Sequence, residues 1–326
     1  MNEPKPAGIR ANLWGQDQHV SPEENEGLLL AFSHKEVEAA LVAIKGDTGP
    51  GPDGWPTSML KAFWPAFRDL TIDICTGFPR GMVNISRLNY VILPLIPKVQ
   101  GADSIKQFRP IALINAPFKI CAKVVATQMS PVAHQVINKC QTTFICGWNI
   151  LEGPVVLQEI VHEIKRTLQK AILLKLDSDK AYDRVNWDFL REVLLAKGFD
   201  AAWVQWILQL VSGARVSGHL KGVLGHLILG VSQLQYVNDT MLVFEPNTHN
   251  IATVKLILLA FEDMSDMKIN FHKCEVIAMG MDETEGRRVA DWLNCQNESG
   301  IWSDLLEAKY FPKGFFFEAS ARGSPF

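Results

Sequence analysis

Residues 171–187 read AILLKLDSDKAYDRVNW, and this stretch decides the fold. The apolar run from Ala171 to Leu176 predicts a short buried strand that ends at Asp177. Asn186 then stands as a candidate N-cap for a helix that Gly198 ends. A carboxylate is therefore expected at the end of a buried strand, directly before a helix.

A second carboxylate is expected at the tip of a hairpin. Residues 234–244 (LQYVNDTMLVF) have a strand–turn–strand pattern with Asn238-Asp239 at the turn. Mg²⁺ is bound through one or two carboxylates plus substrate phosphates, so Asp177 and Asp239 together are candidates for a nucleotidyl-transfer site. Aspartate is also common at turns, and spacing alone favours two ordinary turn residues over a metal site.

Composition limits the classes of protein that the chain can represent. The 326 residues are 48% hydrophobic and carry a net charge of −3, so there is no global basic field for nucleic acid. The six cysteines form no CxxC pair, which argues against a zinc site and a disulfide framework. No signal peptide and no apolar run of about 18 residues is present, so we expect an intracellular protein, nuclear or cytoplasmic, with no membrane partner.

The remaining segments mix helices with short strands. Ser33 and Glu36 form a capping box for one helix, and the glycine- and proline-rich residues 49–54 interrupt the chain after it. No regular βαβ repeat occurs, so the fold class is α+β. Helices are expected over residues 58–76, 117–138, 151–169, 201–210 and 251–264, and strands over residues 90–97, 108–115 and 275–279.

Several motifs, in this order, resemble reverse transcriptases of non-LTR (LINE-type) retrotransposons, of a plant-like kind. Residues 175–187 resemble the first catalytic motif of that family, and residues 236–239 (YVND) resemble its tyrosine-x-aspartate-aspartate hairpin. Any one motif alone is a weak signal, whereas seven in the same order along the chain are specific. The others are Gly51-Pro52-Asp53-Gly54, Leu95-Ile96-Pro97-Lys98, Phe108-Arg109-Pro110-Ile111, Gln141-Thr142-Thr143-Phe144-Ile145 and the segment from Met267 to Glu275.

The resemblance implies a role for individual residues. Asp177 and Asp239 would be catalytic metal ligands for Mg²⁺, and Asn238 occupies the position of the principal hairpin aspartate. Lys98 and Arg109 would bind the triphosphate of an incoming nucleotide, a role that suits the charge of both and the planar fork of arginine. The implied partners are an RNA or DNA primer-template and dNTPs.

The sequence departs from the family at several points. Asn238 brings no charge to a metal ion, and no Gln-Gly-Asp-Pro motif lies between Asp177 and Asp239, which indicates an internal deletion. Trp148 stands where the family commonly has arginine. The segment from Gly300 to Phe311 resembles a region far downstream in plant elements, joined after Cys295.

We therefore expect a truncated right-hand polymerase with fingers and an incomplete palm, and without polymerase activity. The predicted divisions are an irregular segment (1–34), fingers (35–125), palm (126–280) and a C-terminal remnant (281–326). The alternatives are an active RNA-directed DNA polymerase, a nucleic-acid-binding protein without activity, a non-functional pseudogene product and an unrelated structural protein.

Overall fold

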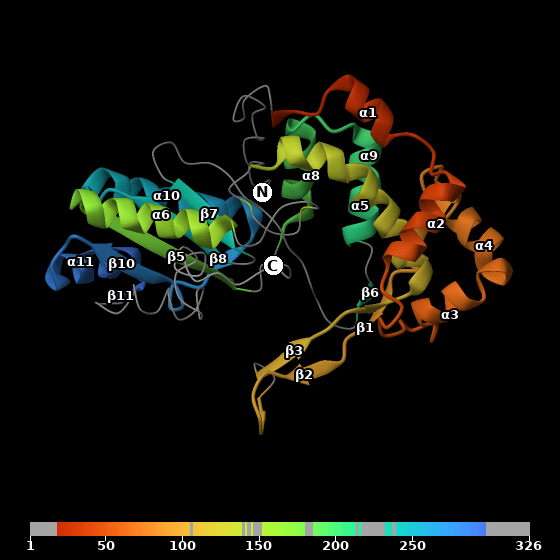
Figure 1. The fold of residues 1–326 in the computed structure, drawn as a ribbon, viewed down its shortest axis with the longest axis horizontal. Coiled ribbons are helices and arrows are strands. Elements are labelled where there is room, and N and C mark those ends of the chain that lie inside the picture. Colours follow the sequence, from red (N-terminus) through yellow and green to blue (C-terminus); the bar gives the residue numbers. More distant parts are fainter. Residues whose placement is uncertain are drawn as a thin grey trace, which may run out of the picture. The chain divides into compact units, whose positions relative to one another are not determined.

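The computed structural model describes residues 18–104, 107–138, 141, 145, 152–179, 185–212, 215–216, 232–236 and 239–297. The chain divides into two compact units, both drawn in Figure 1, and each is described by itself below. The first unit comprises Met1–Ile137 and Trp187–Lys221, and the second comprises Asn138–Asn186 and Gly222–Phe326. The described elements form a mixed α+β architecture, as the sequence predicted.

The first helices of the first unit begin at capping boxes. Ser21 and Ser33 each accept a hydrogen bond from the backbone N–H three residues later, and Glu24 and Glu36 accept one from the cap. These bonds satisfy N–H groups that have no partner within the helix. The predicted box at Ser33 is confirmed. The helices of this unit are α1 (Pro22–Leu28), α2 (His34–Ala43), α3 (Thr57–Ala62), α4 (Trp64–Gly77), α5 (Ala116–Val136), α8 (Trp187–Ala196) and α9 (Ala201–Ser212).

The prediction of one helix over residues 58–76 is wrong, because α3 and α4 are separate. Phe63 ends α3 and begins α4 with φ −109° and ψ 27°, outside the helical region. Pro65 lies in the first turn of α4. Proline has no N–H and restricts the residue before it, so a helix reaching this point stops and restarts.

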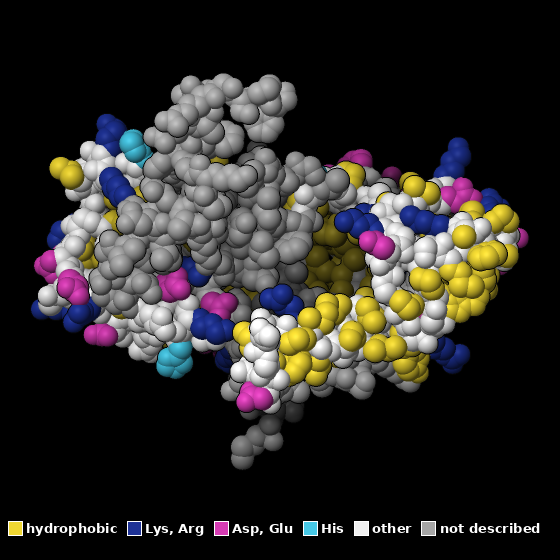
Figure 2. All heavy atoms as spheres, turned by 60° about the horizontal axis from the view of Figure 1, so that its bottom comes forward, with side chains coloured by type: hydrophobic (Ala, Val, Ile, Leu, Met, Phe, Trp, Pro, Cys, Tyr) yellow, Lys and Arg dark blue, Asp and Glu magenta, His cyan; other side chains and the backbone are white. Residues whose placement is uncertain are grey.

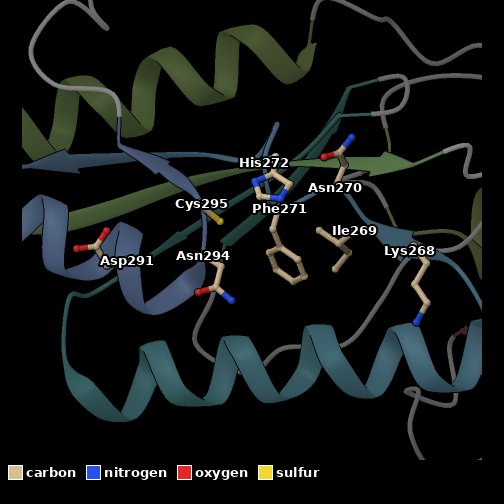
Figure 3. A pocket seen from close by; sticks show the side chains of 8 residues that line it. All are labelled: Lys268, Ile269, Asn270, Phe271, His272, Asp291, Asn294 and Cys295. Atoms are coloured by element: carbon tan, nitrogen blue, oxygen red, sulfur yellow. The ribbon is translucent and has the colours of Figure 1, made fainter. Parts of the chain in front are cut away.

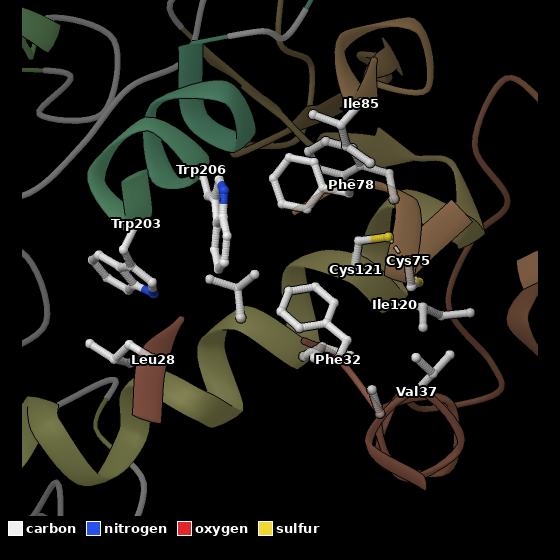
Figure 4. Packing of buried hydrophobic residues seen from close by; sticks show 14 of the residues in the cluster. Leu28, Phe32, Val37, Cys75, Phe78, Ile85, Ile120, Cys121, Trp203 and Trp206 are labelled. Carbon is white, nitrogen blue, oxygen red and sulfur yellow. Dashed lines mark hydrogen bonds between the residues drawn. The ribbon is translucent and has the colours of Figure 1, made fainter. Parts of the chain in front are cut away.

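Aromatic side chains join α9 to the N-terminal helices in the core of the first unit (Figure 4). The ring of Trp206 lies 6.1 Å from that of Phe32, edge to face, and 6.3 Å from that of Phe78. Trp203, fully buried, stacks on Phe199 at 4.5 Å. Residues that follow the first catalytic motif in the sequence therefore complete a core begun by the N-terminal helices.

Short strands in the first unit form two separate groups. Strand β1 pairs with β4 antiparallel and with β6 parallel, whereas β2 and β3 pair with each other as a two-stranded ribbon. The expectation of one strand over residues 90–97 and one over 108–115 is wrong, because each is divided; Pro94, between β1 and β2, cannot donate a ladder hydrogen bond. The strands are β1 (Tyr90–Ile92), β2 (Leu95–Pro97), β3 (Phe108–Pro110), β4 (Leu113–Ile114) and β6 (Arg215–Val216).

A sheet in the order β11-β10-β5-β8-β7 forms the centre of the second unit, and β9 pairs with the end of β5. The β7–β8 hairpin and the strand at residues 275–279 were predicted, and both are confirmed. The prediction that Asp239 lies in the turn is wrong, because Asp239 is the first residue of β8 and pairs with Tyr236. The strands are β5 (Ala171–Asp179), β7 (Ser232–Tyr236), β8 (Asp239–Phe244), β9 (Lys268–Ile269), β10 (Glu275–Met279) and β11 (Gln296–Asn297).

Helices cover both faces of this sheet. On one face, Leu174 of β5 belongs to an apolar cluster with Val254 of α10 (Thr248–Ser265) and Leu293 of α11 (Glu283–Leu293). On the other, Leu173 packs with Leu157 of α6 (Glu152–Thr167). Side chains alternate between the faces along a strand, so β5 is apolar on both sides, as a central strand must be. Within the described ranges, every helix is too short or too polar to pass through a lipid bilayer.

Candidate functional site

Strand β5 brings Asp177 opposite the start of strand β8. In the antiparallel β5–β8 ladder, Asp177 and Asp239 are register partners. Asp177 lies within β5 and does not end it as predicted, because β9 pairs with Ser178 and Asp179 and extends the strand. The two aspartates predicted from the sequence thus meet at one place in the sheet; Asn238 and the side chain of Asp239 lie outside the described residues.

Residues of the turn between β9 and β10 contact both the backbone and the side chain of Asp177. The N–H of Asn270 donates to the carbonyl oxygen of Asp177 at 2.8 Å, and the N–H of Asp177 donates to Sγ of Cys274 at 3.4 Å. The Nζ of Lys273 lies 3.5 Å from Oδ2 of Asp177. The Lys273 side chain is 68% exposed, so this ion pair contributes only about 0–1 kcal/mol to stability. The ammonium group of Lys273 nevertheless lies close to the carboxylate of Asp177.

Sequence reasoning missed these contacts of Asp177. Asn270, Lys273 and Cys274 all lie in the family-like segment from Met267 to Glu275, which was recognised by its order in the chain without a role for its residues. Lys273 lies two residues before β10, and nothing in the neighbouring sequence indicates that it pairs with Asp177. The position of that segment in the motif order was the available clue.

A second ion pair lies two residues before Asp177 on the same strand. Lys175 is 8% exposed, and its Nζ lies 3.3 Å from Oε2 of Glu275, its register partner on β10. Removing one member of a buried ion pair leaves an uncompensated charge, which is costly. This pair therefore fixes β5 against β10 close to the candidate site.

An open cavity of about 740 Å³ lies beside this turn (Figure 3). Residues 268–272 line one part of it, and Asp291, Asn294 and Cys295 line the part at the end of α11. Contact with the thiol of Cys295 lowers the pKa of Cys274, and contact with Cys274, together with burial, raises the pKa of Cys295. The cavity thus adjoins a pair of interacting thiols, one of which accepts the amide hydrogen bond of Asp177.

The described residues do not make up a complete Mg²⁺ site. Asp177 offers a carboxylate, but the ammonium group of Lys273 is close to it and would repel a divalent cation. Among the side chains that the structure describes, no group of three or more histidine, cysteine, aspartate or glutamate residues could hold a metal ion. Hard cations require several oxygen ligands, so Asp177 is at most one member of such a set.

Lys98 and Arg109, the residues expected to bind a triphosphate, lie on one ribbon of the first unit. Arg109 of β3 is the register partner of Ile96 on β2, and Lys98 directly follows β2, with its N–H bonded to the carbonyl of Gln107 at 2.8 Å. Because strand side chains alternate, Ile96, Lys98 and Arg109 are expected on one face. Figure 2 shows hydrophobic side chains exposed on one face of the molecule. On this ribbon and directly after β2, the residues Leu95, Ile96 and Val99 are each about half exposed.

The Gly51-Pro52-Asp53-Gly54 motif holds a loop against the start of α5. Oδ2 of Asp53 accepts the N–H of Ala116 at 3.2 Å, and Oδ1 accepts the N–H of Trp55 at 3.1 Å. The side chain of Asn115 accepts the N–H of Asp53 at 3.0 Å and donates to the carbonyl of Leu88 at 2.9 Å. A helix leaves its first N–H groups without partners, so Asp53 caps α5 from a distant part of the chain.

Some sequence predictions lie outside the described residues. They include Trp148, most of the segment from Gln141 to Ile145, the interval 217–231 where the motif is missing, and the C-terminal segment beyond residue 297. The thiols of Cys75, Cys121, Cys274 and Cys295 are free.

Comparison with known proteins identifies the family. Residues 96–294 match the family model described as reverse transcriptase (RNA-dependent DNA polymerase), which is more than half of the chain. Over 203 residues, 62% of this chain, the sequence is 27% identical to the transposon TX1 uncharacterized 149 kDa protein of Xenopus laevis. The match spans only 15% of that relative's length. Both findings agree with the motif order of a non-LTR retrotransposon enzyme, and the chain belongs to the reverse transcriptase family.

Proposed function

We propose that this chain is a reverse transcriptase descendant that has lost polymerase activity and retains nucleic-acid binding in its fingers-like region. Reverse transcriptases are nucleotidyltransferases that normally use divalent metal ions and bind a template and primer. The observation that carries the proposal is the Asn238-Asp239 pair on the hairpin opposite Asp177. An amide in place of a carboxylate removes a negative charge where metal ions and developing phosphate charge must be stabilised.

The short interval before the hairpin supports the same proposal. Strand β6 ends at Val216 and β7 begins at Ser232, and the Gln-Gly-Asp-Pro motif expected between them is absent from the sequence. In the family that motif begins a helix that supports template and nucleotide. A site that lacks this support loses the geometry on which catalysis depends.

The proposed organisation is a truncated right hand. Residues 35–125 would be fingers, 126–280 an incomplete palm, and 281–326 a remnant of a plant-like element, after an irregular segment at 1–34. Asp177 and Asp239 would be the surviving metal ligands, Asn238 the altered position, and Lys98 and Arg109 the contacts to phosphate. We place the protein in the nucleus or cytoplasm.

Primer extension on an RNA template tests the loss of activity. With Mg²⁺, and then with Mn²⁺, we expect the purified chain to extend a primer no further than Asp177→Ala does, because the charge at Asn238 and the supporting motif are both missing. The measurement is the length of labelled DNA on a denaturing gel. Each ~1.4 kcal/mol lost in transition-state stabilisation lowers the rate tenfold, so modest defects combine into a large one.

An active reverse transcriptase in the same reaction controls for the substrates, and circular dichroism controls for folding of both variants. Extension by the parent that Asp177→Ala abolishes would overturn the proposal of inactivity. The Asn238→Asp variant separates the two causes: restored extension assigns the defect to the amide, and continued inactivity assigns it to the missing interval.

Binding of single-stranded RNA tests the retained part of the function. We expect affinity to fall as salt rises, and Arg109→Ala to lower the slope of log K against log [salt] by about 1, as the loss of one phosphate contact does. Fluorescence anisotropy of a labelled RNA measures both. Arg191→Ala is the matched control, because Arg191 pairs with Asp188 at 3.1 Å on α8, away from the ribbon in the sequence. Equal slopes for both variants would argue against a role for Arg109.

A further inference from the structure

Cys274 and Cys295 directly precede two parallel strands of the second unit. Strands β10 and β11 pair in parallel with Glu275 opposite Gln296, and each cysteine directly precedes one of these residues. The N–H of Gln296 donates to the carbonyl of Cys274 at 2.9 Å, so the pairing continues to the cysteines. Neighbouring strands lie about 4.8 Å apart, within the ~4.4–6.8 Å between Cα atoms that a disulfide spans.

The two thiols differ in their exposure. Cys274 is 0% exposed and belongs to the apolar cluster beneath β5, against which Cys295 packs. Cys295 is partly exposed and lines the open cavity of about 740 Å³ (Figure 3). A small reagent in that cavity therefore reaches Cys295, whose thiol is in contact with that of Cys274.

The other pair of neighbouring thiols in the described residues lies inside the core of the first unit. Cys75 of α4 and Cys121 of α5 have their sulfur atoms 2.9 Å apart, and both are 0% exposed (Figure 4). Reaction of a thiol depends on access as well as on proximity to a partner. This second pair is enclosed in the core, which makes it an internal comparison.

We propose that Cys274 and Cys295 form an oxidative modification site, which a small peroxide entering the cavity converts to a disulfide. The sulfur of Cys295 attacks one peroxide oxygen; an S–O bond forms, the O–O bond breaks, and the first water leaves with the thiol proton. The sulfur of Cys274 then displaces the hydroxyl from the sulfenic acid, which leaves as the second water. The two thiols are oxidised by two electrons, and hydrogen peroxide is reduced to two waters.

This site goes beyond the proposed function and does not depend on polymerase activity. The Sγ atom of Cys274 accepts the N–H of Asp177. A disulfide to Cys295 would therefore alter the hydrogen bond of the candidate catalytic residue. Contact with Cys274 and burial raise the pKa of Cys295, so we expect the reaction with peroxide to be slow.

Limited oxidation of the full chain with hydrogen peroxide tests the proposal. Samples are quenched by alkylation in denaturant and mapped by mass spectrometry without reduction. We expect the peptide containing Cys274 linked to Cys295 to appear first and to exceed the Cys75–Cys121 link several-fold at early times. Earlier formation of the Cys75–Cys121 link, or conversion of Cys295 to sulfinic acid without a bond to Cys274, would overturn it.

Two serine variants complete the test. Cys295→Ser should remove the early disulfide and leave Cys274 reduced, whereas Cys75→Ser should leave the rate of Cys274–Cys295 formation unchanged. Hydrogen exchange of the Asp177 amide should change on oxidation of the parent and not of Cys295→Ser. Unchanged exchange of the Asp177 amide in the oxidised parent would reject an effect of the disulfide on Asp177. Mapping of the oxidised parent shows whether the Cys274–Cys295 disulfide forms, even if a serine variant fails to fold.

Discussion

Replacing Gly51 with alanine is expected to lower the free energy of unfolding by about 3 kcal/mol, the upper part of the range for overpacking. A Cβ atom at this position would lie 2.4 Å from the backbone nitrogen of Asn115 and 2.5 Å from the carbonyl carbon of Ile114. Both are main-chain atoms at the junction of β4 and α5, so no side chain can turn aside to make room. The backbone must move instead, which disturbs the hydrogen bonds that Asp53 makes there.

Gly27→Ala is the matched control, because nothing lies within 4 Å of a Cβ added at Gly27 near the end of α1. Alanine favours a helix over glycine by up to about 1 kcal/mol, so this variant should be neutral or slightly stabilised. Urea unfolding followed by tryptophan fluorescence measures both variants. Equal stability of Gly51→Ala and Gly27→Ala would mean that the loop and α5 are not held together as the structure shows.

Local signals in the sequence predicted the elements that depend on neighbouring residues. The capping box at Ser33, the β7–β8 hairpin and strand β10 each follow from a few consecutive residues, because capping, turn formation and strand alternation act over that range. The family-like motif order predicted that Asp177 and Asp239 belong together, and the β5–β8 register places them opposite each other.

Features that depend on distant residues were not predictable. The surroundings of Asp177 come from a turn nearly one hundred positions later, and Lys273 gives no local sign of its partner. The role of Asp53 as a cap for α5 likewise needs a contact 63 positions away. Strands β1 and β2 are separate because β1 pairs with β4 and β6, whereas β2 pairs with β3. Hydrophobic periodicity indicates which residues are buried, but it does not indicate which distant residues cover them.

Leu174→Ala is expected to lower the stability of the sheet in the second unit by about 2–5 kcal/mol, the cost of deleting a buried leucine side chain. Leu174 is 0% exposed in the middle of β5, between Leu242 of β8 and Val276 of β10. Val254 of α10 closes the same cluster, so the surroundings are held on several sides and cannot collapse fully into the space. The strand that carries Asp177 would lose its main support.

Hydrogen exchange of the β5 amides, followed by mass spectrometry, measures this effect at the strand itself. Each ~1.4 kcal/mol of lost stability speeds exchange through unfolding about tenfold, so the β5 amides should exchange tens to thousands of times faster than in the parent. Leu256→Ala on α10 is the control, since Leu256 is 68% exposed and its removal leaves no cavity. Equal exchange in both variants would show that β5 is not the packed centre of the sheet, and the case for a candidate site built on it would fall with that result.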